Sequence, residues 1–240
     1  MEGRAIGDVG PIRSVSVDAD LAWAEVPRPP GDDTPPGQEA TLFRSGDGRF
    51  TAGFWRRPAR EGAMTRPYDE VSILIDGVAE VIDPDGTVHR AGPGDVLVTP
   101  RGSAGSWRCV TPVTKFWAIC ETDVEAPGTF AVPGDGPLGW EEVPRPDGDT
   151  APAGEEAVLW RSADGTFVVG FWRRAPEEGA MAPPYHELAY VLEGDVDVVE
   201  ADGTSHAVGP RHLLITPEGS RATWKSRTPV RKFWAIYKGR

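Results

Sequence analysis

Short apolar runs separated by turns make up most of the chain. Residues 71–75 and 188–192 are rich in β-branched and aliphatic residues, and each run ends close to a glycine. The apolar runs that follow, 78–82 and 196–199, lead into Asp-Gly pairs, which are the strongest short signal of a β-hairpin. No helical period persists for three turns. The pattern predicts an all-β protein of many short strands, arranged as a sandwich or a barrel.

The same series of strands occurs twice. Residues 21–120, shifted by 117 positions, fall on residues 138–237 without a gap, and roughly half of the pairs are identical, which is too extensive for chance. Whatever fold one repeat adopts, the other should adopt as well, so a difference between equivalent positions is informative. The predicted units are an N-terminal tail or added edge strand (1–20), a first barrel (21–120), a linker (121–137) and a second barrel (138–237).

The composition argues against some classes of binding partner. A formal net charge of −12 at pH 7 argues against nonspecific binding to nucleic acid or to anionic membranes. No apolar run reaches the roughly 18 residues of a membrane span, and no apolar signal segment follows Met1, so we expect a cytoplasmic protein. Cys109 and Cys120 have Ser226 and Tyr237 as counterparts. We therefore expect no disulfide.

Both repeats carry a glutamate and a turn at matching positions. Glu70 and Glu187 each lie seven residues before a glycine, and Pro-x-Gly turns begin at Pro100 and Pro217. In the second repeat Arg211 stands where the first has a turn glycine. These features resemble the two motifs of the cupins, G-x5-H-x-H-x3–4-E-x6-G and G-x5-P-x-G-x2-H-x3-N. The resemblance covers nearly all of both repeats and implies two tandem jelly-roll β-barrels, a bicupin that arose by internal duplication.

The histidines of both motifs are missing. Residues 63–67 and 180–184, where the first motif has its two histidines, contain none, and the histidine of the second motif aligns with Gly105 and Ala222. Of the usual cupin metal ligands only the glutamate remains in each repeat. A single carboxylate does not hold a transition metal against water. We therefore expect no metal ion and no other cofactor in either barrel.

Trp107 and Trp224 stand two residues beyond the missing histidines. Because side chains two apart on a strand share a face, we expect both indoles to point into the barrels. The pattern Pro-x-Gly-x4-Trp resembles a metal-poor cupin branch that includes the (S)-ureidoglycine aminohydrolases and the ethanolamine-utilisation cupins. The aminohydrolases keep a metal in one barrel, so the resemblance implies the fold and not that reaction.

Glu70 and Glu187 are the candidate catalytic groups. The same alternation places Tyr68 beside Glu70 and Tyr185 beside Glu187, all on the inward face. Burial near tryptophan would raise the pKa of a carboxyl group, as a general acid or base requires. The alternative is that each glutamate accepts hydrogen bonds from Tyr or Trp and only organises its barrel, which its presence in both repeats favours.

Tryptophans and histidines are the candidates for binding a ligand. Tryptophan lines ligand pockets well, although most of these residues could equally belong to a core that the duplication preserved. Asp69 has a histidine as its counterpart in the second repeat, and so has Asp95. We expect the first of these histidines on the outer face or at a barrel mouth. The candidates are Trp224, Trp172, Trp107, Trp55, His186 and His212.

Basic side chains are repeated beside these candidates. Arg56, Arg57 and Lys115 have Arg173, Arg174 and Lys232 as counterparts. They could hold the carboxylate of a ligand through charge-assisted hydrogen bonds. We favour the alternative that they lie on solvated strand faces and form ion pairs, as is common in an acid-rich protein.

Three hypotheses of function remain open. The first is a metal-independent enzyme that acts on a small organic molecule by acid/base chemistry, as an isomerase, cyclase, lyase or hydrolase. The second is a noncatalytic bicupin that binds or senses a small molecule. The third is a metal-dependent enzyme with a site rebuilt in the second barrel from Glu187 and the histidines there. A homodimer is compatible with each of them.

Overall fold

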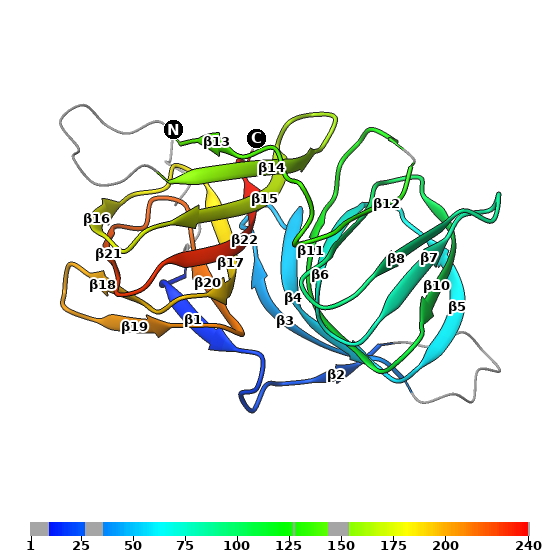
Figure 1. The fold of residues 1–240 in the computed structure, drawn as a ribbon, viewed down its shortest axis with the longest axis horizontal. Coiled ribbons are helices and arrows are strands. Elements are labelled where there is room, and N and C mark those ends of the chain that lie inside the picture. The colour runs from blue at the N-terminus through cyan, green and yellow to red at the C-terminus, as the bar shows by residue number, and fades with distance from the viewer. Residues whose placement is uncertain (1–9, 27–35, 127, 144–153, 240) are drawn as a thin grey trace, which may run out of the picture.

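The computed structural model describes residues 10–26, 36–126, 128–143 and 154–239. These residues form strands, turns and loops, and none of them belongs to a helix that could cross a membrane. Figure 1 shows two barrels side by side, one from each half of the chain. The prediction of an all-β protein with two tandem barrels is confirmed.

The first barrel consists of a seven-stranded and a four-stranded sheet, both antiparallel. The central strands β6 and β11 are long and almost wholly buried, as their β-branched and aromatic sequences favour. In spatial order, the larger sheet contains β12 (Phe130–Val132), β9 (Val96–Thr99), β6 (Asp69–Asp76), β11 (Val113–Cys120), β4 (Phe50–Arg57), β3 (Gln38–Arg44) and β2 (Ala24–Glu25). The smaller sheet contains β5 (Arg60–Thr65), β10 (Ala104–Cys109), β7 (Ala79–Ile82) and β8 (Val88–Ala91).

The second barrel repeats this arrangement with the equivalent strands. Its larger sheet contains β1 (Arg13–Ser16), β20 (His212–Thr216), β17 (His186–Glu193), β22 (Val230–Tyr237), β15 (Phe167–Arg174), β14 (Glu155–Arg161) and β13 (Glu141–Glu142). Its smaller sheet contains β16 (Glu178–Met181), β21 (Ala222–Ser226), β18 (Val196–Glu200) and β19 (Ser205–Val208).

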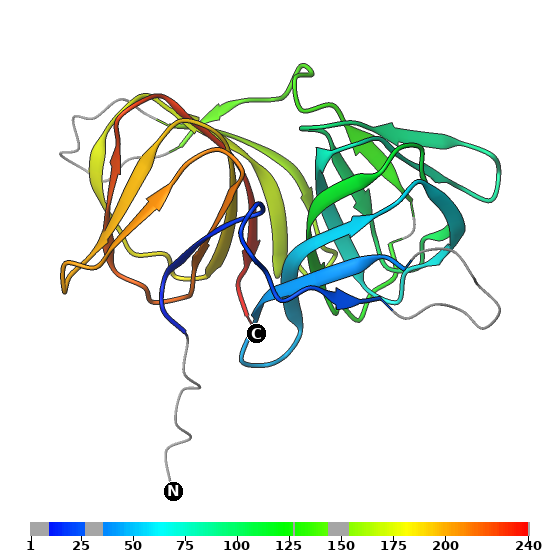
Figure 2. The ribbon, with the colours of Figure 1, turned by 90° about the horizontal axis from the view of Figure 1, so that it is seen from below.

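The two larger sheets pack against each other and bury the largest apolar cluster of the described residues. Figure 2 shows the barrels meeting along these sheets. Aromatic rings cross the boundary: the centroids of Phe116 and Phe233 are 6.2 Å apart, and Phe50 stacks on Tyr237 at 5.2 Å. Such contacts add to the free energy gained from apolar burial. The interface between the barrels is thus a hydrophobic core in its own right.

Because successive side chains point to opposite faces of a strand, each central strand directs one set of side chains to this interface and the other set into its own barrel. On β22, Phe233 and Ala235 join the interface core, whereas Lys232, Trp234 and Ile236 line the barrel pocket. The same phase on β11 turns Lys115 and Trp117 into the first barrel. The inward faces therefore carry polar and aromatic groups, and the outward faces carry the apolar contact between barrels.

The barrels exchange their first strands. β1 precedes the first repeat but pairs with β20 of the second barrel, and β12 precedes the second repeat but pairs with β9 of the first. Arg13 pairs with Ile215 and Phe130 pairs with Val98, so the offset of 117 residues also relates β1 to β12. Sequence comparison detected the repeat only from residue 21, because these two strands share little beyond their extended conformation. Residues 13–16 therefore belong to the repeated unit.

Candidate functional site

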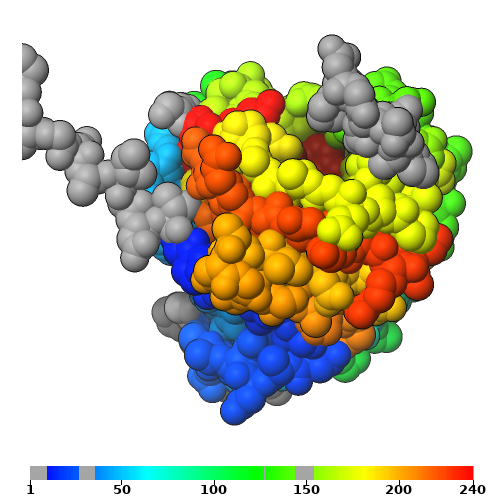
Figure 3. Space-filling model, turned by 90° about the vertical axis from the view of Figure 1, so that its left-hand side faces the viewer, coloured from blue at the N-terminus to red at the C-terminus, as the bar shows by residue number. Residues whose placement is uncertain are grey.

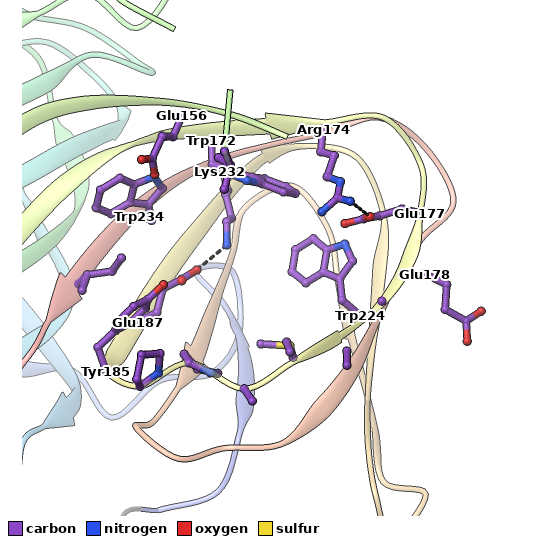
Figure 4. A pocket seen from close by; sticks show the side chains of 18 residues that line it. Glu156, Trp172, Arg174, Glu177, Glu178, Tyr185, Glu187, Trp224, Lys232 and Trp234 are labelled. Atoms are coloured by element: carbon purple, nitrogen blue, oxygen red, sulfur yellow. Dashed lines mark hydrogen bonds and ion pairs between the residues drawn. The ribbon is translucent and has the colours of Figure 1, made fainter. Parts of the chain in front are cut away.

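An open pocket of about 690 Å³ lies in the second barrel. Strands β14, β15, β17, β21 and β22 contribute its walls, and the segment from β16 to β17 forms its rim. Figure 3 shows the corresponding face of the barrel hollowed by a recess. Figure 4 shows the side chains that surround the space. Its size suits a small organic molecule.

Glu187 and Lys232 meet at the inner end of this pocket. The ammonium Nζ of Lys232 donates a short hydrogen bond to Oε1 of Glu187, drawn as a dashed line in Figure 4. The two side chains keep 16% and 12% of their surface exposed. The structure gives Oε2 of Glu187 no partner among the residues that it describes. The carboxylate can therefore still accept a hydrogen bond or a proton from a bound molecule.

Two tryptophans enclose the ammonium group. Nζ of Lys232 lies 5.0 Å from the ring centroid of Trp172 and 5.2 Å from that of Trp224, close enough for cation–π attraction. The two indoles meet edge to face at 5.8 Å. Nε1 of Trp224 is buried and has no hydrogen-bond partner among the described residues. The pocket thus combines apolar walls with a charged pair and a donor.

The rim of the pocket carries further ionisable groups. Arg174 forms an ion pair with Glu177 on the side of the pocket where Trp224 lies (Figure 4). Burial, together with the charges of Glu187 and Glu156, raises the pKa of Tyr185 to about 12. The hydroxyl of Tyr185 is therefore neutral at pH 7 and can donate a hydrogen bond.

The first barrel has a much smaller pocket, of about 210 Å³. Thirteen residues line it, and at twelve of these positions the second barrel has the identical residue. The single difference is Arg66, which has Pro183 as its counterpart. The guanidinium of Arg66 reaches into the barrel and lies 3.1 Å from Oε2 of Glu70. This side chain contributes to the smaller space in the first barrel.

Glu70 is held by three groups at once. Besides Arg66, the ammonium of Lys115 donates to its Oε1, and the hydroxyl of Ser72 donates to the same oxygen at 3.2 Å. Burial alone would raise the pKa of Glu70, but the charges of Arg66 and Lys115 outweigh it and lower the pKa to about 2. The prediction that burial near tryptophan raises the pKa of this carboxyl group is therefore wrong, because two cations share its site.

The structure brings together most of the residues that the sequence singled out. Glu187, Tyr185, Trp172 and Trp224 line the pocket of the second barrel. Their counterparts line the smaller pocket of the first barrel: Glu70, Tyr68, Trp55 and Trp107. All four tryptophans therefore have inward positions, which strand alternation predicted for Trp107 and Trp224.

The two candidate histidines do not line the pocket. His186 lies in the interface between the barrels, where its ring is 5.1 Å from that of Phe43 and stacks on Tyr237. Its Nδ1 accepts the backbone N–H of Glu218 at 3.0 Å, and burial lowers its pKa. Its counterpart Asp69 accepts the N–H of the equivalent residue, Arg101. The position anchors a turn in both barrels. His186 lies on the outer face of its barrel, as expected, but it is buried in the interface and not at a barrel mouth.

His212 begins β20 and is hydrogen-bonded to the carbonyl of Pro210. It lies opposite Ser16 in the register of β1, away from the pocket lining. His206 pairs with Glu200, as its counterpart His89 pairs with Asp83. These side chains are engaged in turns and hairpins of the frame.

The residues present do not fit the usual cupin metal ion. Among the described residues, no group of three or more His, Cys, Asp or Glu side chains could hold a metal. In each barrel the one remaining glutamate is paired with a lysine ammonium, which brings a positive charge to the place a metal cation would need. The histidines of the second barrel are not gathered around Glu187, so the structure shows no rebuilt site in the described part of the chain.

Lys115 and Lys232 are the site residues that sequence reasoning missed. We expected them on solvated faces or in ion pairs; they do form ion pairs, but inside the barrels, with 6% and 12% of their side chains exposed. A signal was available: each lysine stands two residues before an inward tryptophan, and therefore shares its face. We gave more weight to the fact that lysine side chains are usually exposed.

Comparison with known families gives a match in each barrel. The sequence model of the EutQ-like cupin domain matches residues 44–117 and again residues 161–234. A search among curated proteins found no significant match.

Solved structures share the complete two-barrel fold. A DUF861-family protein of unknown function from Pseudomonas syringae pv. tomato superposes with a TM-score of 0.78 at 18% identity, covering 94% of this chain and 99% of its own. Ylba from E. coli, also of the DUF861 family, has a TM-score of 0.65 at 12% identity, covering 98% and 94%. A cupin 2 conserved barrel domain protein from Leptotrichia buccalis has a TM-score of 0.63 at 11% identity, covering 93% and 100%. Identities this low show a common fold and no common activity.

Proposed function

Because the chain belongs to the EutQ-like cupin family, with two such domains in tandem, we propose that its second barrel is a metal-independent site for acid/base chemistry on a small organic molecule. The observation that carries this proposal is the difference between the barrels. The same Glu–Lys pair and the same tryptophans surround an open pocket in the second barrel and a largely filled one in the first.

Glu187 is the proton acceptor of this proposal. Its Oε1 is held by Lys232, which fixes the carboxylate, while Oε2 remains for the bound molecule. When Oε2 takes a proton, the electron pair of the broken bond stays on the substrate. The ammonium of Lys232 lies beside the negative charge that develops there and stabilises it. The neutral hydroxyl of Tyr185 can hydrogen-bond the same molecule. Isomerisation, cyclisation, elimination and hydrolysis can all begin with such a step.

The test is turnover of pooled small polar metabolites, followed by NMR, with binding followed by the rise in melting temperature. In Glu187→Gln the amide can still receive the hydrogen bond of Lys232 but cannot take a proton. We expect this variant to keep the ligand-dependent rise in melting temperature and to lose at least 100-fold in turnover, the usual contribution of a positioned acid or base. Full turnover in Glu187→Gln would refute the proposal.

Tyrosine variants provide a matched control. Tyr185→Phe should reduce turnover, whereas Tyr68→Phe, the same change in the filled barrel, should leave it unchanged. If both tyrosine variants reduce turnover equally, the assignment of the reaction to the second barrel is wrong.

A noncatalytic binding protein is the second candidate. The observation in its favour is that the filled barrel retains the same pair, tyrosine and tryptophans, so these residues are compatible with a purely organising role. This alternative predicts that wild-type protein shows the rise in melting temperature without forming any product.

A further inference from the structure

The two barrels allow a comparison of the same site with and without an occupant. In the first barrel the two oxygens of Glu70 each have a cation: Lys115 at Oε1 and Arg66 at Oε2. In the second barrel Lys232 again takes Oε1 of the glutamate, but the second cation is missing. The arginine of the first barrel therefore occupies the place that a ligand would take in the second.

From this comparison we infer that the pocket of the second barrel takes an organic cation with N–H donors, of the guanidinium or amidinium class, bound to Oε2 of Glu187. The inference rests on the proposed function, since it names the substrate class of that same pocket. Arg66 then serves in the first barrel as a covalently attached occupant of the equivalent site. Its guanidinium lies beside Oε2 of Glu70 as an ion pair while its Nε–H donates to Oγ1 of Thr99, and the free cation would likewise lie beside Oε2 of Glu187.

The charges around the two pockets support a cation in the second. Four carboxylates and two cationic side chains line the open pocket: Glu156, Glu177, Glu178, Glu187, Arg174 and Lys232. Lys225, outside the lining, pairs with Glu178 at 2.8 Å, so an excess of one negative charge remains. Two carboxylates and three cationic side chains line the filled pocket, an excess of one positive charge. They are Glu39, Glu70, Arg57, Arg66 and Lys115.

Two substitutions produce most of this contrast. Arg66 has Pro183 as its counterpart, which removes one positive charge from the lining, and Arg60, which does not line the first pocket, has Glu177, which adds one negative charge to the lining of the second. A carboxylate oxygen without a cationic partner, such as Oε2 of Glu187, attracts a cation more strongly in a partly enclosed, low-dielectric pocket than in water. The tryptophan pair adds faces on which a planar cation can lie.

The loops that carry these residues share one backbone hydrogen bond, although the N–H of Arg66 also donates to Ser103 and Pro183 has no N–H. The N–H of Gly102 donates to the carbonyl of Arg66 at 2.9 Å, and the N–H of Gly219 donates to that of Pro183 at 3.1 Å. Both residues also precede a proline, which restricts their conformation in the same way. A side chain exchanged at this position should therefore take the direction that it has in the other barrel.

Because the two positions are equivalent, the side chains at 66 and 183 can be exchanged and ligand binding compared. Ethylguanidinium is the probe, and ethylurea is its uncharged analogue. The indole N–H signals of 15N-labelled protein, assigned with single Trp→Phe variants, report which barrel binds. In wild type, ethylguanidinium should shift the signals of Trp172 and Trp224, with a Kd in the millimolar range expected of so small a ligand. Ethylurea should bind at least tenfold more weakly.

One variant should weaken binding in the second barrel, and the other should create a binding site in the first. Pro183→Arg should fill the second barrel and raise the Kd at least tenfold there, while the signals of the first barrel report an intact fold. Arg66→Ala keeps its backbone N–H and should create a second binding site, seen as new shifts of Trp55 and Trp107. If Pro183→Arg does not fold, this gain of a site in Arg66→Ala still tests the inference.

The results distinguish this inference from the proposed function. Equal or tighter binding of ethylurea in the second barrel would overturn the choice of a cation and leave a small-molecule site there. Shifts in neither barrel for wild type and for Arg66→Ala would also overturn it, and the turnover of Glu187→Gln would then decide the proposed function separately. Shifts of Trp172 and Trp224 that Pro183→Arg abolishes would support both.

Discussion

At the scale of single residues, one position separates a filled barrel from an open one. Twelve of thirteen lining positions are identical, so apolar burial and the Glu–Lys pair are the same on both sides. Arg66 changes the ionic balance around Glu70 and takes up space as well. A buried carboxylate with two cations is strongly held, and removing one partner of such a group leaves an uncompensated charge.

We expect Glu70→Gln to lower the free energy of unfolding by about 3 kcal/mol near pH 7, because Lys115 and Arg66 would then face each other without a counter-charge. The pKa of Glu70 is lowered to about 2 in the folded protein, so its stabilisation is complete above the unfolded pKa of about 4.3 and is lost as the pH falls toward about 2. The difference between wild type and variant should shrink over that range. Urea unfolding at several pH values measures it.

The matched control is Glu187→Gln in the second barrel. Glu187 has one cationic partner where Glu70 has two, and its side chain is more exposed, so we expect a smaller loss of stability. Losses of equal size that do not depend on pH would contradict the account given for Glu70.

At the scale of elements, the exchange of β1 and β12 ties the repeats together. Each barrel completes its larger sheet with a strand that precedes the other repeat. Ion pairs from the turn before β20 help to hold this arrangement. Arg211 has a positive φ of 66°, where the first barrel has Gly94, and its guanidinium bridges Asp18 after β1 and Asp76 at the end of β6. These ion pairs offset the cost of a left-handed backbone in a residue with a side chain.

We expect Ile12→Ala to weaken the second barrel although the residue lies in the first 20 of the chain. Ile12 is buried in the interior cluster of the second barrel, so truncation should cost about 3 kcal/mol. Hydrogen exchange should speed up more for β20 amides than for β9 amides. Phe130→Ala on β12 is the control and should reverse this order; a larger loss of protection in β9 than in β20 for Ile12→Ala would contradict the exchange of strands.

At the scale of the whole molecule, the apolar interface makes the two barrels one cooperative unit. The largest buried cluster draws residues from β4, β6 and β11 on one side and from β15, β17 and β22 on the other. Each barrel encloses a smaller cluster of its own. Because the shared cluster contains more buried apolar residues than the two private clusters together, the stability of one barrel depends on the other.

We expect Phe116→Ala, a truncation at this interface, to lower the free energy of unfolding by about 4 kcal/mol. Calorimetry should still show a single transition at a lower temperature, because both sheets lose the same contacts. A first barrel that melts separately below the second would show that the interface does not couple them.

Sequence reasoning reached much of this structure because its strongest signals are local. Alternation with a period of two residues predicted that Trp107, Trp224 and both glutamates face inward, and Asp-Gly turns predicted the hairpins. The duplication predicted two barrels of one fold, and the lost histidines were visible as residue types at fixed positions. None of these depends on knowing which distant segments meet.

The remaining features depend on contacts between residues far apart in the chain. Whether Lys232 is solvated or paired depends on Glu187, 45 residues away, and which barrel β1 completes depends on a pairing nearly 200 residues away. Arg66 and Pro183 are plain in the sequence, yet their effect required knowing that the guanidinium turns inward to Glu70. Burial, and the free energy of charges within it, are properties of the assembled barrels, and the chain acquires them only when its distant segments pack together.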